Sequence, residues 1–105
     1  MKQLCVVGAL SILVAGGSAA HAQQAAALQV RALAATCASC HGTDGRAIPS
    51  GAVPGLAGMP AGYFVEQMKG FQSGTRNATV MHQLAKGFNE VQIQQLAAYF
   101  AAQPK

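Results

Sequence analysis

Three residues that can do chemistry stand together in the first half of the chain, in the stretch TCASCHGTDG. Cys37 and Cys40 lie three positions apart, and His41 follows at once. Thiols with this spacing can form a redox-active disulfide, supply half of a zinc site or attach a haem group. The rest of the sequence must decide between these three chemistries.

The sequence Cys-x-x-Cys-His favours haem attachment. A thioredoxin-like dithiol requires a βαβ surrounding, which the strand-poor pattern of this chain does not predict. A zinc site requires further ligands, and only His82 is left, because the N-terminal segment with Cys5 is expected to be removed. Two thiols on one helical turn can each add to a haem vinyl group, and the next imidazole then lies under the iron. We therefore predict one haem c, bound covalently through Cys37 and Cys40, with His41 as an axial ligand.

The second axial ligand must come from outside this motif. Met68 falls on a helical apolar stripe and is expected to pack in the core, whereas Met59 lies at a helix entry and is expected to contact the haem edge. Met81 lies in a loop 40 residues after the histidine of the motif, so it has the slack to reach the far face of a haem. Neighbouring residues of an extended loop point in opposite directions, so only one of Met81 and His82 can face the iron. We favour Met81, with His82 or an open site as the alternatives.

The identity of the second ligand determines the function. A histidine and a methionine together fill both axial positions and leave no place for dioxygen or peroxide, and a soft thioether favours ferrous iron. That arrangement is typical of an electron carrier, whereas an open position is typical of ligand binding or catalysis. We therefore expect an electron carrier rather than an enzyme.

The N-terminus has the pattern of a signal peptide. Lys2 precedes the apolar stretch Leu4–Ala15, and Ala20-His21-Ala22 fits a small-x-small cleavage site. The apolar stretch is shorter than the roughly 18 residues that a membrane anchor needs. We expect residues 1–22 to be removed on export, which leaves a single domain of residues 23–105 in the periplasm with no stable membrane insertion.

The charge of the chain is small and scattered. The formal net charge is +4, and it falls to about +3 when Lys2 leaves with the signal peptide. No block of Lys and Arg indicates a nucleic-acid partner, so none is expected. The mild positive balance favours nothing more specific than an acidic partner or a membrane surface.

The pattern of apolar and helix-breaking residues predicts an all-α fold with three main helices. An Ala-rich helix runs from about Ala25 into the cysteine motif, a second follows Pro60 and stops at Gly74, and a third begins after Asn89 and ends before Pro104. Asn89 is expected to cap the third helix in a capping box with the glutamine three residues on. The expected apolar stripes are Leu28, Ala32 and Ala35; Phe64, Met68 and Phe71; and Ile93, Leu96 and Phe100.

Two loops connect the helices. Residues 42–60 carry so many glycines and prolines that no strand is expected, and a loop of this length is unusual in a small domain unless it wraps around something. The second loop, Thr75–Gly87, holds Arg76, Met81 and His82. A haem would supply the apolar core that a domain of about 80 residues lacks, and the long loop could wrap its edge.

Five stretches of the sequence carry a resemblance to a known family: CASCHG, VPGLAG, AGYFVEQMKGFQSGTR, TVMHQLAKGF and EVQIQQLAAYFAAQ. In this order and spacing they resemble small bacterial class I c-type cytochromes, most closely the cytochrome subunit of flavocytochrome c sulfide dehydrogenase. The resemblance implies a small class I cytochrome c fold with long loops wrapped around one haem. It also implies that Met81 is the axial ligand, and that Met59 stands where relatives often have glutamine.

The resemblance implies roles for further residues. The carbonyl of Pro54 would accept a hydrogen bond from the axial imidazole and fix its orientation. Leu56 would pack on the haem ring. Arg76 would pair with a haem propionate, with a solvated loop arginine as the alternative. Tyr99 and Phe100 match terminal-helix aromatics that pack against the first helix.

These expectations describe a periplasmic single-haem electron-transfer protein. The resemblance implies a redox protein as partner, such as a flavoprotein sulfide dehydrogenase from which the haem would accept electrons. The alternatives are a general soluble carrier that serves a terminal oxidase or reductase, and a haem enzyme or sensor with a labile sixth ligand. With so few charges, docking is expected on a mostly apolar patch around Ala38, Ala47, Ile48 and Val80.

Overall fold

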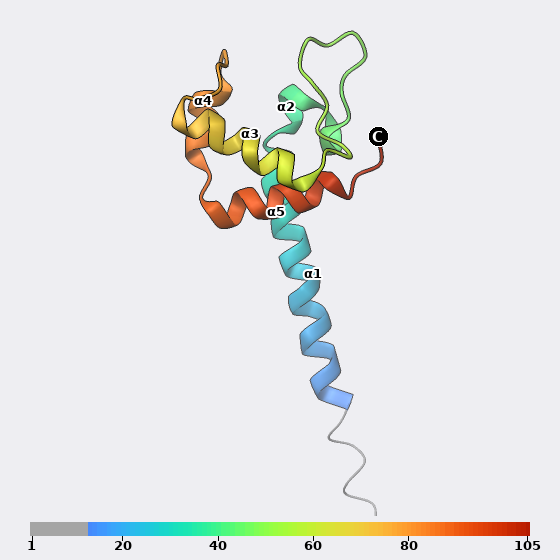
Figure 1. Cartoon of the computed structure of the whole chain (residues 1–105). Coiled ribbons are helices and arrows are strands. Elements are labelled where there is room, and N and C mark those ends of the chain that lie inside the picture. Colours follow the sequence, from blue (N-terminus) through green and yellow to red (C-terminus); the bar gives the residue numbers. More distant parts are fainter. Residues whose placement is uncertain (1–12) are drawn as a thin grey trace, which may run out of the picture.

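The computed structural model describes residues 13–105, in which three long helices and four short helical turns are joined by loops (Figure 1). The long helices are α1 (Leu13–Ala35), α3 (Ala61–Ser73) and α5 (Glu90–Ala101). The short elements are α2 (Ala38–His41), the 3₁₀ turn η1 (Thr43–Gly45), α4 (Met81–Leu84) and the 3₁₀ turn η2 (Ala85–Gly87). No strand occurs between Leu13 and Lys105, and the predicted all-α fold is confirmed.

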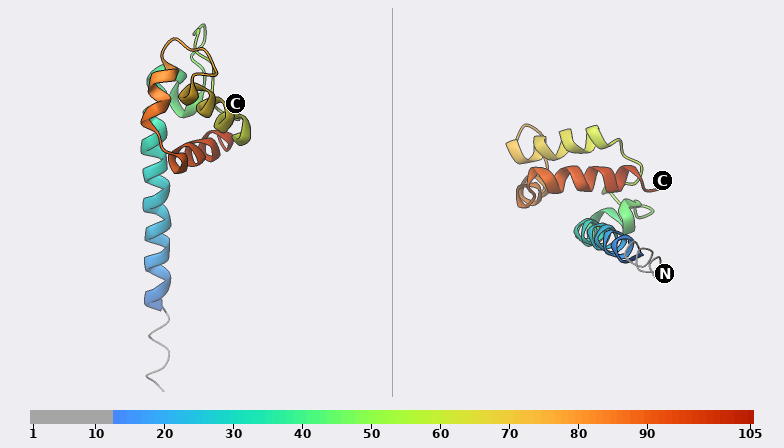
Figure 2. Two further views of the ribbon diagram at one scale, coloured as in Figure 1. Left: turned by 60° about the vertical axis from the view of Figure 1, so that its left-hand side comes forward. Right: turned by 90° about the horizontal axis from the view of Figure 1, so that it is seen from below.

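The helix α5 provides more buried core residues than any other described element. It packs against both α3 and α1, and Figure 2 shows α3 and α5 running side by side while α1 runs across them. Ile93, Leu96 and Phe100, the predicted stripe of α5, are fully buried, and Phe64 and Met68 of the predicted α3 stripe are buried beside them. The rings of Phe64 and Phe100 lie 5.7 Å apart, centroid to centroid. Each such fully buried side chain contributes about 1.5–3 kcal/mol.

The helices α3 and α5 begin and end where the sequence predicts. At the start of α5 the backbone N–H of Gln92 donates to Oδ1 of Asn89 over 2.9 Å, and the N–H of Asn89 donates to Oε1 of Gln92 over 3.0 Å. This capping box satisfies two N–H groups that would lack partners in the first turn. The helix α3 follows Pro60 and ends at Gly74, which adopts the left-handed conformation with φ 77°.

The N-terminal part of α1 extends further than predicted. The helix begins at Leu13 rather than near Ala25, so the predicted cleavage point after Ala22 falls inside it, while residues 1–12 lie outside the described residues. Residues 17–29 are exposed, and this part of α1 projects away from the other helices (Figure 1). None of the described helices combines the length and the apolarity that a bilayer crossing requires.

The core-facing side of α1 also differs from the prediction. The expected stripe is wrong, because Leu28, Ala32 and Ala35 are all exposed. Ala34 is buried instead, and Leu33 packs against the core cluster. An Ala-rich helix has few side chains that distinguish one face from another, so its sequence period does not identify the packed face. The helix also stops at Ala35, where a turn separates it from α2.

The segment predicted as the loop Thr75–Gly87 is helical in its second half. It forms α4 and η2 there, and both turns pack against α3. A turn of three or four residues is too short to show a hydrophobic period and is not stable by itself. The contacts with α3 therefore determine this local structure.

The long loop between α2 and α3 is held against α5 at Gly45. This residue has φ 76°, and its carbonyl oxygen accepts a hydrogen bond from the N–H of Leu56 over 2.7 Å. A Cβ atom at Gly45 would lie 2.8 Å from the ring of Phe100. Nearby, the hydroxyl of Tyr99 donates to the carboxylate of Asp44 over 2.5 Å, and this hydrogen bond raises the pKa of Tyr99. Two residues of α5 thus hold the loop that follows the cysteine motif.

Replacing Gly45 with alanine should lower the free energy of unfolding by about 2–4 kcal/mol, because the added methyl group meets Phe100 and Leu56 and the positive φ disfavours a side chain. The matched control is Gly62→Ala on α3, where nothing lies within 4 Å of an added Cβ. Alanine should stabilise that helix by up to about 1 kcal/mol. Urea unfolding followed by circular dichroism measures both variants. Equal stability of the two would contradict the close packing of this loop on α5.

Candidate functional site

A cavity of about 780 Å³ lies between α2, α3 and the segment from Arg76 to Phe88. Its volume is typical of sites that enclose small molecules and cofactors. Its wall is mostly apolar, and Arg76 brings a positive charge to it. All the residues predicted to hold a haem line this one cavity: Cys37, Cys40, His41, Pro54, Leu56, Arg76 and Met81.

The two cysteines present their thiols from one helical turn. Cys37 precedes α2, and its carbonyl oxygen accepts hydrogen bonds from the N–H groups of Cys40 over 3.3 Å and His41 over 2.9 Å. This turn keeps both residues on the cavity wall, with Cys37 half-buried and Cys40 exposed. Burial raises the pKa of the Cys37 thiol. In a haem-free chain at neutral pH this thiol is therefore mostly protonated.

The imidazole of His41 is oriented by a backbone carbonyl. Its Nδ1 lies 2.7 Å from the carbonyl oxygen of Pro54. A carbonyl oxygen can only accept, so Nδ1 carries the proton and donates it. In a neutral ring with this tautomer, the other nitrogen, Nε2, has the free lone pair that binds a metal.

Met81 lies on another wall of the cavity and is half-buried. It is the first residue of α4, so the predicted extended backbone at Met81 and His82 is wrong. Neighbouring side chains on a helix are rotated by about 100° rather than pointing in opposite directions. Of the pair, Met81 lines the cavity, whereas His82 does not, and the buried Nδ1 of His82 has no hydrogen-bond partner among the described residues.

Two further thioethers border the cavity. Met68 is 5% exposed and belongs to the core cluster, as its helical stripe predicts. Met59 is half-buried in the loop before α3 and packs against the same cluster. Met81 differs from both, because it lies on a short separate turn and not in α3 or the loop that leads into it.

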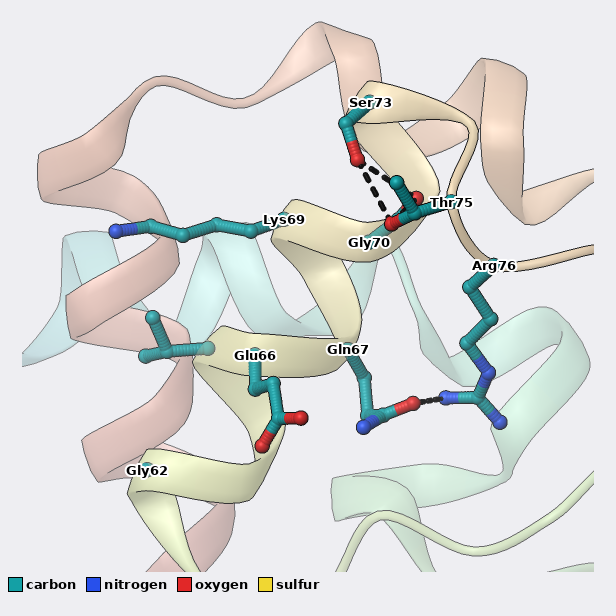
Figure 3. Close-up of a pocket in the computed structure, with 9 residues that line it drawn as sticks. Gly62, Glu66, Gln67, Lys69, Gly70, Ser73, Thr75 and Arg76 are labelled. Atoms are coloured by element: carbon teal, nitrogen blue, oxygen red, sulfur yellow. Dashed lines mark hydrogen bonds between the residues drawn. The ribbon is translucent and has the colours of Figure 1, made fainter.

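Arg76 and Gln67 line both this cavity and a second hollow of about 870 Å³ on the outer side of α3 (Figure 3). The guanidinium of Arg76 donates to Oε1 of Gln67, and its central carbon lies 4.7 Å from the centroid of the Phe71 ring. Stacking on an aromatic ring holds a guanidinium while leaving its charge available. The outer hollow is lined by no cysteine, histidine or methionine, so the chemistry of the cysteine motif belongs to the first cavity.

Phe88 is a cavity residue to which the sequence assigns no role, although it is the last residue of the family-like stretch TVMHQLAKGF. It lies between η2 and the cap of α5, lines the cavity and packs against the core. A single aromatic residue between Gly87 and Asn89 belongs to no periodic stripe. Its position after a glycine and before a helix cap, at the end of that stretch, is the signal from which a role for Phe88 could have been predicted.

The apolar surface at the cavity differs in part from the predicted docking patch. Of the four predicted residues, Val80 lines the cavity, whereas Ala38, Ala47 and Ile48 do not. The exposed large apolar residues that line the cavity are Val53, Tyr63, Val80 and Leu84. We call these four residues the cavity rim.

The helices, the cavity and the Cys-x-x-Cys-His turn define a small all-helical domain with a cofactor-sized hollow. The profile of the cytochrome c family matches residues 27–103, and the chain belongs to this family. Members of the family bind haem c and transfer electrons. The predicted resemblance to class I c-type cytochromes and the predicted small cytochrome c fold are thereby confirmed.

Three known proteins show how the chain relates to this family. It is 40% identical to the thiosulfate dehydrogenase electron acceptor of Thiomonas intermedia over an alignment of 68 residues. This alignment covers 65% of this chain and 31% of that protein. It is 38% identical to the cytochrome subunit of sulfide dehydrogenase of Chlorobaculum tepidum over an alignment of 68 residues. That alignment covers 65% of this chain and 60% of the relative. The solved structure of cytochrome c4 from Acidithiobacillus ferrooxidans matches with a TM-score of 0.59 and 41% identity, over 63% of this chain and 37% of that one. The chain thus spans less than two thirds of each of these relatives.

Proposed function

We propose that the chain is a periplasmic electron-transfer protein that holds one haem c, bound covalently through Cys37 and Cys40. One observation carries this proposal: two thiols, the imidazole of His41 and the thioether of Met81 all line a single, largely apolar cavity. These residues fit the group, since they offer two attachment points on one helical turn and a nitrogen and a sulfur as ligands. When bound, the haem supplies an iron that gains and loses one electron.

His41 is the first axial ligand in this proposal. The hydrogen bond to Pro54 supports it, because that bond keeps the proton on Nδ1 and leaves Nε2 for the iron. An oriented imidazole also loses little freedom on binding, which favours a permanent ligand. Pro54 acts here through His41 and does not itself touch the metal.

Met81 is the second axial ligand. Its place on the cavity wall supports the assignment, and the absence of His82 from that wall weighs against the alternative. Two protein ligands would leave no coordination site for a substrate, and a thioether favours the reduced iron. We therefore propose a carrier and not an enzyme.

Leu56 and Arg76 would contact the haem without binding its iron. Leu56 is 9% exposed and offers an apolar surface to the ring. Arg76 stacks on Phe71 at the exposed side of the cavity, where its guanidinium can neutralise a propionate carboxylate. The role of both residues in this proposal is to position the haem.

Export precedes this function in our proposal, with residues 1–22 as the signal peptide and residues 23–105 as the mature domain. Residues 17–22 are exposed on the projecting part of α1, so their removal leaves every core contact in place. The attachment of haem c to two thiols fits a compartment outside the cytoplasm.

The partner in this proposal is a redox protein that delivers electrons, such as a flavoprotein dehydrogenase of a reduced sulfur compound. The names of the relatives, an electron acceptor of thiosulfate dehydrogenase and a cytochrome subunit of sulfide dehydrogenase, support this class. A stable complex with such a partner would bury the apolar cavity rim within an interface larger than the roughly 1,200 Å² below which redox contacts are transient. A general carrier that serves a terminal oxidase or reductase is the alternative.

Replacing Met81 with alanine should abolish the near-infrared charge-transfer band of methionine-bound ferric haem. It should also let the reduced protein bind carbon monoxide rapidly, because one axial position is opened. Met59→Ala is the matched control and should keep the band and exclude carbon monoxide. Rapid carbon monoxide binding by the unmodified protein at neutral pH would contradict the closed site. Loss of the band in Met59→Ala but not in Met81→Ala would show that Met59, and not Met81, is the ligand.

A flavoprotein dehydrogenase should co-purify with the tagged mature chain from its native cells, and the contact should survive a rise in salt from about 0.1 M to 1 M, since the rim is apolar. Val80→Asp should weaken the capture because it adds a charge to the rim. Val91→Asp is the matched control, because Val91 is 64% exposed on α5 and does not line the cavity. Recovery of the chain only as a free monomer would favour the general-carrier alternative.

A further inference from the structure

Gln72 on α3 makes two hydrogen bonds that the sequence gives no reason to expect. Its side-chain amide nitrogen donates to the carbonyl oxygens of both Ala85 and Phe88, each over 2.9 Å. These two carbonyls flank the 3₁₀ turn η2, and both hydrogen bonds are partly buried. An amide group has two N–H donors, so one side chain satisfies a carbonyl at each end of the turn.

The hydrogen-bonded path continues from this turn to Met81. The N–H of Ala85 donates to the carbonyl oxygen of Met81, which closes the single turn of α4. The N–H of Phe88 donates to the carbonyl oxygen of Ala85 over 3.2 Å. A chain of hydrogen bonds thus leads from the side chain of Gln72 to the backbone of Met81 through one intervening residue.

Apart from its packing on α3, few contacts hold the turn α4 in place. It is four residues long and contains no buried residue, and a helix so short is not stable by itself. The residues before it are exposed, Thr79 and Val80 included. Ala85, in contrast, is fully buried, and α3 is anchored in the core by Phe64 and Met68. The position of α4 therefore depends on α3, through direct packing and through the hydrogen bonds at the C-terminal end of the turn.

We propose that Gln72 is a positioning residue for Met81, which holds α4 against α3 and so keeps the thioether directed to the iron. This inference rests on the proposed function, because it takes Met81 as the axial ligand. Leucine at this position would fill similar space but donate nothing. Glutamate would place a carboxylate, which accepts hydrogen bonds, against two carbonyl oxygens.

The test uses the haem-loaded protein with Gln72→Leu, and Gln94→Leu as the matched control. Gln94 is an exposed glutamine on α5 whose side chain, among the described residues, bonds only to Glu90, over 3.4 Å. Two signals are followed on heating the ferric protein: the methionine-to-iron charge-transfer band and the helical circular dichroism. Carbon monoxide binding to the reduced protein is measured at 25 °C.

The expected result is a separation of the two signals. In Gln72→Leu the band should vanish well below the temperature at which the helices unfold. Carbon monoxide should bind about tenfold faster than in the unmodified protein, because the two hydrogen bonds that hold the turn are lost. Gln94→Leu should behave like the unmodified protein in both measurements. A merely structural role for Gln72 would instead move the band and the helical signal together.

Three outcomes would overturn the proposal. The band and the carbon monoxide rate of Gln72→Leu could equal those of the unmodified protein, or the band could be lost only together with the helices. If Gln72→Leu does not fold, the same two signals are followed in Gln72→Glu, which keeps the length of the side chain but cannot donate to the two carbonyl oxygens. Unfolding of that variant as well would show a global role for Gln72. A missing band in the unmodified protein would instead contradict Met81 as ligand, so failure of the proposed function is distinguishable.

Discussion

The buried face of α5 is the constraint on which the site depends. Ile93, Leu96 and Phe100 have no exposed surface, and they hold α3 and α1 in fixed positions. The same helix fixes the loop after the cysteine motif, through Gly45 packed on Phe100. The walls of the cavity are therefore attached to one rigid element, and a domain of this size needs such an arrangement because its own core is small.

The two proposed iron ligands are held in different ways. His41 is held by a helical turn and by one direct hydrogen bond to Pro54. Met81 belongs to a four-residue turn without buried residues, and it depends on contacts that pass through α3. Since openings of a folded protein begin where few buried contacts exist, the methionine side is where we expect the site to open first. Whether the proposed haem site is closed to external ligands thus depends on the methionine side.

Local signals explain which features the sequence predicts. The capping box of Asn89 and Gln92, the stop at Gly74 and the cysteine motif each involve residues a few positions apart. The face of α1 and the helical form of Met81 depend on distant partners, and the predictions for both are wrong. The seven predicted site residues all line one cavity, although they are distant in sequence, because the family resemblance selects residues that lie together in the fold. The two hydrogen bonds of Gln72 span 13 and 16 residues and have no local signature.

The central claim is that Cys37, Cys40, His41 and Met81 hold a single haem c. The intact mass of the exported protein tests this claim most directly, measured under denaturing conditions together with its visible absorption. We predict the mass of residues 23–105 plus one haem, which remains attached after unfolding, and a spectrum of six-coordinate, low-spin haem. A mass without haem, or a haem that separates on unfolding, would contradict the covalent site.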